Sequence, residues 1–253
     1  MCTIIVLNQV NGSYPLIIAA NRDESYKRTS SPPRLLQKEP FVVYAPRDLE
    51  RGGTWIGVGQ GGWFVGVTNQ DLDRRQHDGD KKSRGDIVEK CLRLDNHHDV
   101  AVVLSTINQS DYDPFNLVFG RAGAMFLCRV HPDLPVDLEI IHPGISVITN
   151  DCSVTQAYAK KAELAREGVI GISTSGDSSA IQDKLWSTLG MHATAHDEPY
   201  QSLCVHDEPH LYGTRSSMVM LVDNNGITDY YHKEGHPCKF VGQAPVVRLP
   251  SMP

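Results

Sequence analysis

The chain opens with two apolar, β-branched runs separated by a turn sequence. Residues 3–10 and 14–20 have the length and composition of buried strands, and Asn11-Gly12 between them is a strong signal for a two-residue hairpin turn. In a tight hairpin about this turn, the numbers of paired residues add up to about 23. We therefore expect Cys2 to begin a core strand and to pair near residue 21.

Later segments repeat this strand–turn–strand pattern. Residues 54–59 and 63–68 flank Gln60-Gly61-Gly62, whose glycines tolerate the positive φ angles of a turn. A third hairpin is expected between residues 216–222 and 227–232, which are separated by a polar turn sequence that ends in glycine.

The rest of the chain mixes short strands with amphipathic helices. Apolar residues at helical spacing predict helices over residues 84–94, 99–107, 153–166 and 180–189. Short apolar runs predict strands over residues 115–119, 124–130, 138–142 and 146–149, and polar stretches predict loops over residues 29–40, 71–83 and 192–210. Strands, then helices, then strands indicate an α+β protein with antiparallel sheets.

Length and composition indicate a folded domain. The 253 residues include 40% hydrophobic and 21% charged side chains, which is ordinary for a globular protein and excludes disorder for most of the chain. We expect a single domain over residues 1–242 and a disordered C-terminal tail over residues 243–253. Homo-oligomer formation is left open.

The charge pattern argues against a nucleic-acid-binding protein. Lys plus Arg number 24 against 30 Asp plus Glu, a net charge of −6, and there is no long basic block. The longest apolar stretches have strand length, whereas a membrane-spanning helix needs about 20 apolar residues. The N-terminus lacks the basic and apolar regions of a signal peptide. We therefore expect a cytoplasmic protein with no membrane span, in which most of the 6 cysteines are thiols.

Cys2 directly follows the initiator methionine and is the most informative single residue. If Met1 is removed, Cys2 carries a thiol and a free α-amine, whose reference pKa of about 7.7 to 8.0 suits a general base near neutral pH. The thiolate would attack a carbonyl carbon and form a thioester acyl-enzyme. On its position alone, a cysteine here is more often a small core residue, so its neighbours decide between the two interpretations.

Four polar residues end the strand that pairs with the one beginning at Cys2. They are Asn21, Arg22, Asp23 and Glu24, and the hairpin register places them beside the thiol. Arg22 can lower the pKa of a thiol or bind a carboxylate, and Asp23 can orient a charged amine. The alternative is a charged loop at a sheet edge. The register with Cys2 favours the active-site interpretation.

A series of short motifs, taken together, resembles the NRDE family, also called the transport and Golgi organisation family. The motifs are Cys2 after the initiator, Asn21-Arg22-Asp23-Glu24, Gly52-Gly53-Thr54-Trp55, Thr68-Asn69, Arg84-Gly85, Phe115-Asn116-Leu117, Thr149-Asn150 and Tyr212-Gly213-Thr214-Arg215. Each is weak alone, but their order and spacing over nearly the whole chain are specific. The resemblance implies the N-terminal nucleophile hydrolase fold, a four-layer αββα sandwich of two antiparallel sheets, distantly similar to choloylglycine hydrolases and penicillin V acylases.

The resemblance also implies roles for single residues. Cys2 matches the nucleophile, Asn69 resembles an oxyanion-hole asparagine, Asn150 a second active-site asparagine, and Arg215 a late arginine of those acylases. The acylases place arginine and aspartate three residues apart, whereas Arg22 and Asp23 are adjacent here, so the division of roles within residues 21–24 stays open. The candidate catalytic residues are Cys2, Arg22, Asp23, Asn69, Asn150 and Arg215, and the candidate substrate-binding residues are Asn21, Glu24 and Trp55. Asn69 and Asn150 are equally compatible with Asx-turns that end strands.

We expect no cofactor and no metal. His192, His196, His206 and His210 include pairs four residues apart, but prolines interrupt any helix that would align them as ligands. No CxxC pair is present, and the glycines at residues 57–62 belong to a hairpin rather than to a dinucleotide-binding loop.

The function expected from these residues and this resemblance is that of a hydrolase or acyltransferase. Its substrate would be a small molecule with a non-peptide C–N amide or a related acyl bond, attacked by Cys2. The main alternative is a non-catalytic protein that binds haem, acyl-coenzyme A or a lipid in the same cleft, because the family has been linked to haem and lipid handling. A scaffold without any pocket at Cys2 is a third interpretation.

Overall fold

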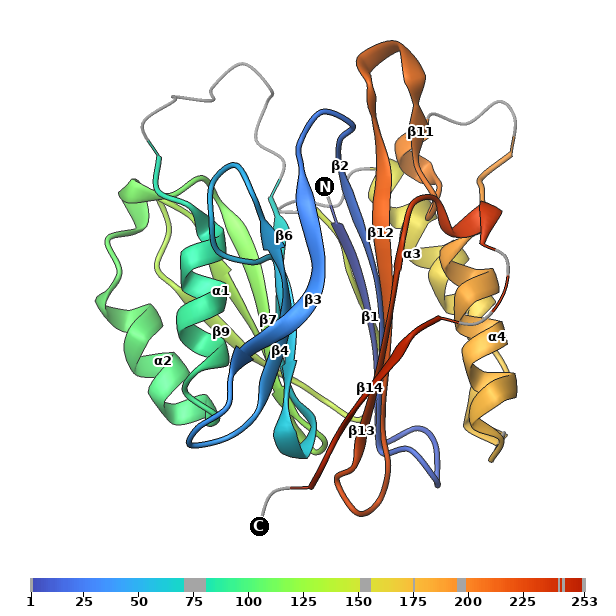
Figure 1. Ribbon diagram of the computed structural model, residues 1–253. Helices are drawn as coiled ribbons and strands as arrows, with labels where there is room; N and C mark the ends of the chain where they lie inside the picture. Colours follow the sequence, from blue (N-terminus) through green and yellow to red (C-terminus); the bar gives the residue numbers. More distant parts are fainter. Residues whose placement is uncertain are drawn as a thin grey trace.

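Two antiparallel sheets, each of seven strands, pack face to face (Figure 1). The computed structural model describes residues 2–70, 81–150, 156–174, 176–194, 199–240, 242 and 244–251. The first sheet has the order β10-β1-β2-β12-β13-β14, with β11 paired to β12, and consists of β1 Cys2–Asn8, β2 Leu16–Ser25, β10 Gly144–Ile148, β11 His206–Asp207, β12 Tyr212–Val222, β13 Thr228–Glu234 and β14 Val246–Leu249. The second runs in chain order from β3 to β9 and consists of β3 Ser30–Gln37, β4 Val43–Asp48, β5 Ile56–Gly59, β6 Trp63–Asn69, β7 Phe115–Arg121, β8 Ala124–Val130 and β9 Asp137–Ile141.

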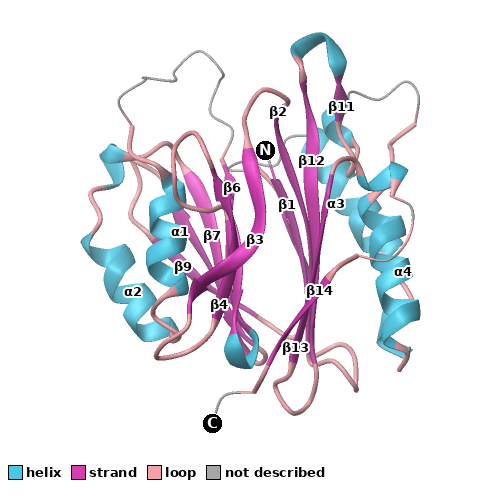
Figure 2. Cartoon of the chain, viewed as in Figure 1, coloured by secondary structure: helices cyan, strands magenta, loops and turns pink. Residues whose placement is uncertain are grey.

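Helices cover the outer face of each sheet (Figure 2). The helices α1 Arg84–Leu92 and α2 His97–Thr106 lie on the second sheet, and α3 Gln156–Gly168 and α4 Ser178–Leu189 lie on the first. One apolar cluster fills the space between the sheets, and one lies beneath each helix pair. The prediction of an α+β, four-layer αββα sandwich is therefore confirmed.

The first two strands are continuous apolar runs in the sequence because their side chains alternate between two buried faces. Ile4 and Val6 point between the sheets, whereas Ile5 and Leu7 point toward α3 and α4. A strand covered on both faces has no solvent side, so none of these positions is polar. Both faces of β1 and β2 are buried in this way except at Cys2 and at the last two residues of β2, which are partly exposed.

The predicted N-terminal hairpin is present, but its register differs by one residue. Cys2 pairs with Arg22, and Asn8 pairs with Leu16, so the connection is the seven-residue segment 9–15 rather than a two-residue turn. Gln9 adopts a positive φ of 55°, and the side chain of Asn11 accepts hydrogen bonds from the backbone N–H groups of Ser13 and Tyr14. This Asx-type loop, rather than a tight turn, sets the register.

Two segments that were expected to be irregular are strands, and a third, the loop predicted over residues 192–210, contains the two-residue strand β11. Residues 29–40 were expected to be a loop, but β3 occupies Ser30–Gln37 at the edge of the second sheet, where Pro32 and Pro33 are tolerated because an edge strand leaves backbone groups unpaired. The tail over residues 243–253 was expected to be disordered, but β14 pairs with β13 inside it. Leu249 at its end is 1% exposed and packs in the cluster between the sheets, which anchors this strand.

The other predicted hairpins and helices lie where the apolar pattern placed them, within a few residues at their ends. Gly61 and Gly62 have the expected positive φ angles at the turn between β5 and β6. The predicted loop over residues 71–83 and the start of the helix predicted over 153–166 lie largely outside the described residues. Among the described helices, none is both long and apolar enough to cross a membrane.

Candidate active site

Cys2 begins β1, and its backbone nitrogen is held by a residue from the neighbouring strand. Asn150 follows the end of β10, the other neighbour of β1, and its side-chain Oδ1 accepts a hydrogen bond from the Cys2 nitrogen at 3.1 Å. Asn150 is fully buried, and its Nδ2 has no hydrogen-bond partner among the described residues. A buried donor without a partner costs about 1–3 kcal/mol, and this one lies next to Cys2, although Asn150 itself lines neither cavity that contains Cys2.

A buried polar network fixes the backbone that carries Asn150. The carbonyl oxygen of Thr149 accepts hydrogen bonds from Thr68 Oγ1 at 2.8 Å and from Asn116 Nδ2 at 3.1 Å. Asn116 Nδ2 also donates to Thr68 Oγ1, and Asn116 Oδ1 accepts from Gln70 Nε2 at 2.9 Å. Thr68 and Asn116 belong to β6 and β7, so this network ties the end of β10 to the opposite sheet.

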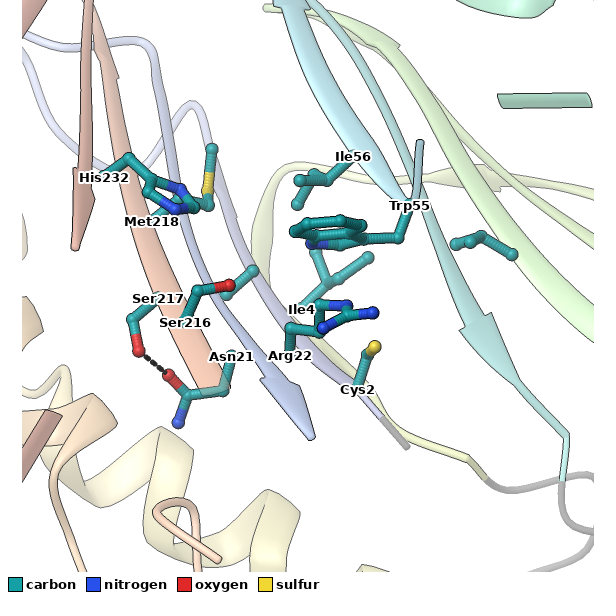
Figure 3. A pocket seen from close by; sticks show the side chains of 12 residues that line it. Cys2, Ile4, Asn21, Arg22, Trp55, Ile56, Ser216, Ser217, Met218 and His232 are labelled. Atoms are coloured by element: carbon teal, nitrogen blue, oxygen red, sulfur yellow. Dashed lines mark hydrogen bonds between the residues drawn. The ribbon is translucent and has the colours of Figure 1, made fainter. Parts of the chain in front are cut away.

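Arg22 is a buried cation that lies directly opposite Cys2 in the pairing of β1 with β2. It pairs directly with Cys2, is 4% exposed, and its guanidinium lies 4.1 Å from the centre of the Trp55 ring. Its Nη2 lies 3.8 Å from Glu24 and 4.0 Å from Asp48, whereas its Nη1 has no hydrogen-bond partner among the described residues. The three side chains of Cys2, Arg22 and Trp55 line one pocket between the sheets (Figure 3).

The surroundings of Cys2 act on the thiol in opposite directions. Burial raises the pKa of the Cys2 thiol above its ordinary value, and the negative charges of Asp23 and Glu24 raise it further. Nearby positive charge, including that of Arg22, lowers this pKa, but burial outweighs it. The expectation that Arg22 lowers the pKa of the thiol therefore holds for its own contribution and not for the net shift.

The alternation of β2 separates Arg22 and Asp23, although they are adjacent in sequence. Arg22 faces the space between the sheets, and Asp23 points to the outer face, where Lys161 of α3 lies 3.1 Å from its carboxylate. Asp23 Oδ1 also accepts a hydrogen bond from Thr214 Oγ1 at 2.6 Å. The Asp23 carboxylate is therefore bound into the first sheet and its helical cover.

Asn21 is on the same outer face as Asp23, and its side chain is occupied. Its Nδ2 donates to the carbonyl oxygens of Leu189 and Leu203, both at 2.9 Å, and its Oδ1 accepts from Ser217 Oγ at 2.6 Å. Figure 3 shows the Asn21 amide turned toward Ser217 and away from Cys2. These contacts make Asn21 a residue that holds α4 against β2 and not one that presents its amide to the pocket.

Arg215 is not brought to the thiol. It lies at an irregularity in the pairing of β12 with β2, and its Nη1 donates to the backbone carbonyls of Ser25, Tyr26 and Arg28. It does not line either cavity that contains Cys2 within the described part of the chain. Arg215 thus clamps the turn after β2, which carries Arg28 over the site.

Above the narrow pocket a wide cleft opens to solvent. The pocket between the sheets has a cavity volume of about 10 Å³, room for about one water molecule, whereas the cavity volume of the cleft is about 750 Å³. Cys2, Arg22, Glu24, Trp55 and Asn69 all line the cleft, with Asn69 contributed by the end of β6 from the sheet opposite Cys2. The Asn69 side chain makes no hydrogen bond to a described residue and is available to a ligand.

The wall of the cleft carries several cationic side chains. Some form ion pairs with carboxylates, and others form hydrogen bonds only to backbone carbonyls among the described residues. Arg28 bridges Glu24 at 2.9 Å and Asp48 at 2.6 Å, and Glu24 is thereby engaged at the rim. Arg51, Lys81 and Arg84 form hydrogen bonds only to backbone carbonyls in the described part of the chain. Burial lowers the pKa of Arg84 below its ordinary value. This part of the wall can attract an anionic group.

Sequence reasoning identified the motif segments but missed the roles of several residues. Lys161 was not considered, because a lysine on an amphipathic helix ordinarily faces solvent, yet it is 1% exposed and pairs with Asp23. Asn116 was noted only as part of a motif. The two glycine-containing motifs at 52–55 and 84–85 pack together: an ideal Cβ on Gly53 would lie 2.6 Å from the carbonyl carbon of Gly85.

The histidines that the sequence offers as candidate metal ligands do not lie together on a helix in the described part of the chain. His196 lies outside the described residues, and His210 contacts Asp207 at 2.7 Å. His192 and His206 approach one another, with ring centres 5.2 Å apart, and two cysteines lie beside them. Local spacing in the sequence does not predict this grouping, because its residues come from segments that only the fold brings together.

The fold is shared with solved N-terminal nucleophile hydrolases. An N-acylethanolamine-hydrolyzing acid amidase ortholog from Caenorhabditis elegans matches with a TM-score of 0.58 and 12% identity, covering 87% of this chain and 92% of that one. A variant of the conjugated bile acid hydrolase from Clostridium perfringens matches with a TM-score of 0.61 and 11% identity, covering 97% and 92%. At these identities the likeness establishes the fold.

Sequence relatives cover most of the chain. The Transport and Golgi organization protein 2 of Drosophila melanogaster is 27% identical over 252 residues, or 88% of each chain, and the Bos taurus homolog is 26% identical over 239 residues, or 85% of this chain and 84% of the relative. The model of the Transport and Golgi organisation 2 family matches residues 1–237. The resemblance seen in the short motifs is thereby confirmed, and the chain belongs to the Transport and Golgi organisation 2 family.

Proposed function

We propose that the protein is a cysteine hydrolase or acyltransferase that cleaves a C–N amide or related acyl bond through Cys2. The observation that carries this proposal is the hydrogen bond from the Cys2 nitrogen to Asn150, together with the position of Cys2 in the lining of an open cleft. Asn150 Nδ2 and Arg22 Nη1, beside Cys2, have no hydrogen-bond partner among the described residues. Removal of Met1 would turn this nitrogen into an α-amine held beside its own thiol. A nucleophile and its general base would then be a single residue.

In the proposed reaction, the Cys2 sulfur bonds to the substrate carbonyl carbon while the thiol proton passes to the Cys2 α-amine. The carbonyl oxygen becomes an oxyanion, for which Asn69 Nδ2 is the proposed donor. The C–N bond then breaks, and the proton leaves with the departing amine. Water or an acceptor nucleophile releases the acyl group from the thioester. One oxyanion donor of this kind contributes about 2.7–4 kcal/mol to the barrier reduction.

The remaining candidate residues receive supporting roles in this proposal. Arg22 lies over the Trp55 ring, and its Nη1 has no hydrogen-bond partner in the described part of the chain, so it would bind an oxygen of the substrate and favour the thiolate. Asp23, held by Lys161 and Thr214, would contribute negative charge next to the amine of Cys2. Arg215 would act as a positioning residue through the turn after β2. The expected cytoplasmic location stays a prediction.

The size of the cleft and the cations on one part of its wall favour a small molecule with an anionic group, while carboxylates line other parts of the same cleft. The narrow pocket beside Cys2 accommodates little more than the reacting group, so the bulk of the substrate would lie in the cleft. Arg51, Lys81 and Arg84 would then bind a carboxylate, phosphate or sulfonate on the part away from Cys2.

A second candidate function is binding without turnover, for haem, acyl-coenzyme A or a lipid in the same cleft. The observation that favours it is the raised pKa of the Cys2 thiol, because burial reduces the thiolate fraction that catalysis requires. In that case the basic wall of the cleft would serve retention of an anionic ligand, and Cys2 would contribute only to the lining of the pocket.

The test is intact-protein mass spectrometry of the chain made in cells, before and after incubation with an activated phenylacetyl ester. We expect a mass short by one methionine and one acyl adduct that maps to Cys2 and is absent in Cys2→Ala. Retained Met1 together with an unreactive Cys2 would overturn the catalytic proposal. Copurified ligand that Cys2→Ala retains in full would support the binding function instead.

A further inference from the structure

Two histidines and two cysteines meet at the outer side of the first sheet, away from the Cys2 cleft. His192, Cys204, His206 and Cys238 each offer one ligand atom, and these four atoms all lie within 4.8 Å of one another. None of the four residues lines a cavity that contains Cys2. They come from the segment after α4, from β11 and the residues before it, and from the single turn Pro237–Lys239.

The distances between these atoms match a tetrahedral metal site. The Nε2 of His206 lies 3.4 Å from the sulfur of Cys204 and 3.3 Å from the sulfur of Cys238. Zinc bonds of about 2.3 Å to sulfur and 2.0–2.1 Å to nitrogen, at tetrahedral angles, separate a sulfur from a nitrogen ligand by about 3.6 Å. A zinc ion could therefore bind between His206, Cys204 and Cys238 if their ligand atoms moved by only a few tenths of an ångström.

Tertiary contacts hold the ligand-bearing segments together. The backbone N–H groups of Leu203 and Cys204 both donate to the carbonyl oxygen of Met191, which places Cys204 beside the residue that precedes His192. Gly190 allows the turn with Cys238 to approach, because an ideal Cβ there would lie 3.2 Å from the Cys238 backbone. His236 packs against His206 with ring centres 4.2 Å apart and restricts that ring.

We propose that His192, Cys204, His206 and Cys238 bind one Zn²⁺ as a closed structural site. Two thiolates and two imidazoles neutralise the divalent ion and select zinc over the hard cations Mg²⁺ and Ca²⁺, which take oxygen ligands. Four protein ligands leave no open coordination position, so the ion has a structural rather than a catalytic role. It links the end of α4, the strand β11 and the segment that leads to β14.

The test measures metal in the full chain purified under reducing conditions. We expect one zinc per chain by elemental analysis, and after removal of zinc we expect Co²⁺ to give the intense visible bands of tetrahedral cobalt with thiolate ligands. Cys204→Ser and Cys238→Ser should weaken zinc binding at least about a hundredfold, because even loss of an outer-sphere partner costs 10–100-fold. Cys2→Ala and His98→Ala are the matched controls and should keep the zinc.

Three outcomes would overturn the proposal, and the first two need no variant to fold. One is a reduced wild-type chain that takes up neither Zn²⁺ nor Co²⁺. Another is a Cys204–Cys238 disulfide that persists in that preparation, seen as a mass lower by two hydrogens. The third is zinc binding that Cys204→Ser and Cys238→Ser leave unchanged.

Discussion

The Asp23 carboxylate and the Lys161 ammonium form an ion pair at 3.1 Å, and neither side chain is more than 1% exposed. This pair joins β2, one residue beyond the partner of Cys2, to the helix α3 that covers the first sheet. Its effect is to keep a charged residue of the candidate site in one place. A buried pair of this kind depends on both partners, because each charge alone would be left without solvent or counter-ion.

Removal of one partner of this pair should be strongly destabilising. We expect Lys161→Met to lower the free energy of unfolding by about 3–5 kcal/mol, since Asp23 is left buried without its cation. Urea unfolding followed by circular dichroism measures the change. The neighbouring Lys160→Met is the control: Lys160 is 39% exposed and pairs with Glu163, so its loss should cost less than about 0.5 kcal/mol. Equal effects of the two substitutions would contradict the buried pair.

The reactivity of Cys2 should rise with pH beyond the ordinary range of a thiol. Because burial raises the pKa of Cys2 above its usual value of 9.0, the thiolate fraction is small at neutral pH and increases through and above that value. The rate of Cys2 alkylation by iodoacetamide against pH, followed by peptide mass spectrometry, reports this midpoint.

Two charge changes should move that midpoint in opposite directions. Arg22→Gln removes a positive charge that lowers the pKa of Cys2 and should shift the midpoint to higher pH. Glu24→Gln removes a negative charge that raises this pKa and should shift the midpoint to lower pH. Shifts of the same sign in both variants would refute this account of the electrostatics.

Asn116 should act on the Cys2 site through Asn150 and not by contact with a ligand. Without Asn116, the Thr149 carbonyl keeps only its bond from Thr68, and we expect Asn116→Ala to slow acylation of Cys2 about tenfold or more and to lower stability by about 1–3 kcal/mol. Asn8→Ala is the matched control, because Asn8 is also a buried asparagine whose side chain forms hydrogen bonds to the backbone of Ile141 and Gly123. A comparable loss of stability with unchanged acylation is expected there. The same acylation rate in both variants would show that Asn116 has no positioning role at Cys2.

The contact between Gly53 and Gly85 should tolerate no side chain. Gly53 has φ +65°, and an ideal Cβ would lie 2.6 Å from the Gly85 carbonyl carbon, so Gly53→Ala adds a backbone clash to the cost of a left-handed conformation. We expect a loss of more than about 2 kcal/mol and a displaced Trp55. Gly52 has φ +71°, but an ideal Cβ there would meet only the side-chain Nη2 of Arg47, at an ordinary contact distance of 4.0 Å, so Gly52→Ala should cost only about 1–2 kcal/mol. Thermal unfolding of both variants makes the comparison, and equal losses would show that φ alone matters.

The strands that are buried on both faces were predictable because their local pattern and their tertiary environment agree. β1 and β2 are continuous apolar runs, and the structure covers them on both sides. Strands β3 and β14 were missed for the opposite reason. Their sequences, with Pro32-Pro33 in one and only a short apolar stretch in the other, do not identify a strand, and pairing at a sheet edge supplies what the sequence lacks.

The sequence by itself determined that Cys2 starts a core strand, that a polar tetrapeptide ends its partner strand, and that the fold is α+β with antiparallel sheets, whereas the layered sandwich was implied by the family resemblance. Hydrophobic periodicity and turn chemistry are local properties, so they are readable along the chain. The tertiary structure alone decided that Arg22 faces the thiol and Asp23 faces Lys161, that Arg215 clamps a turn, and that His192, Cys204, His206 and Cys238 meet. These relations depend on register, strand alternation and contacts between segments far apart in the chain, where a shift of one residue reverses the side on which a side chain lies.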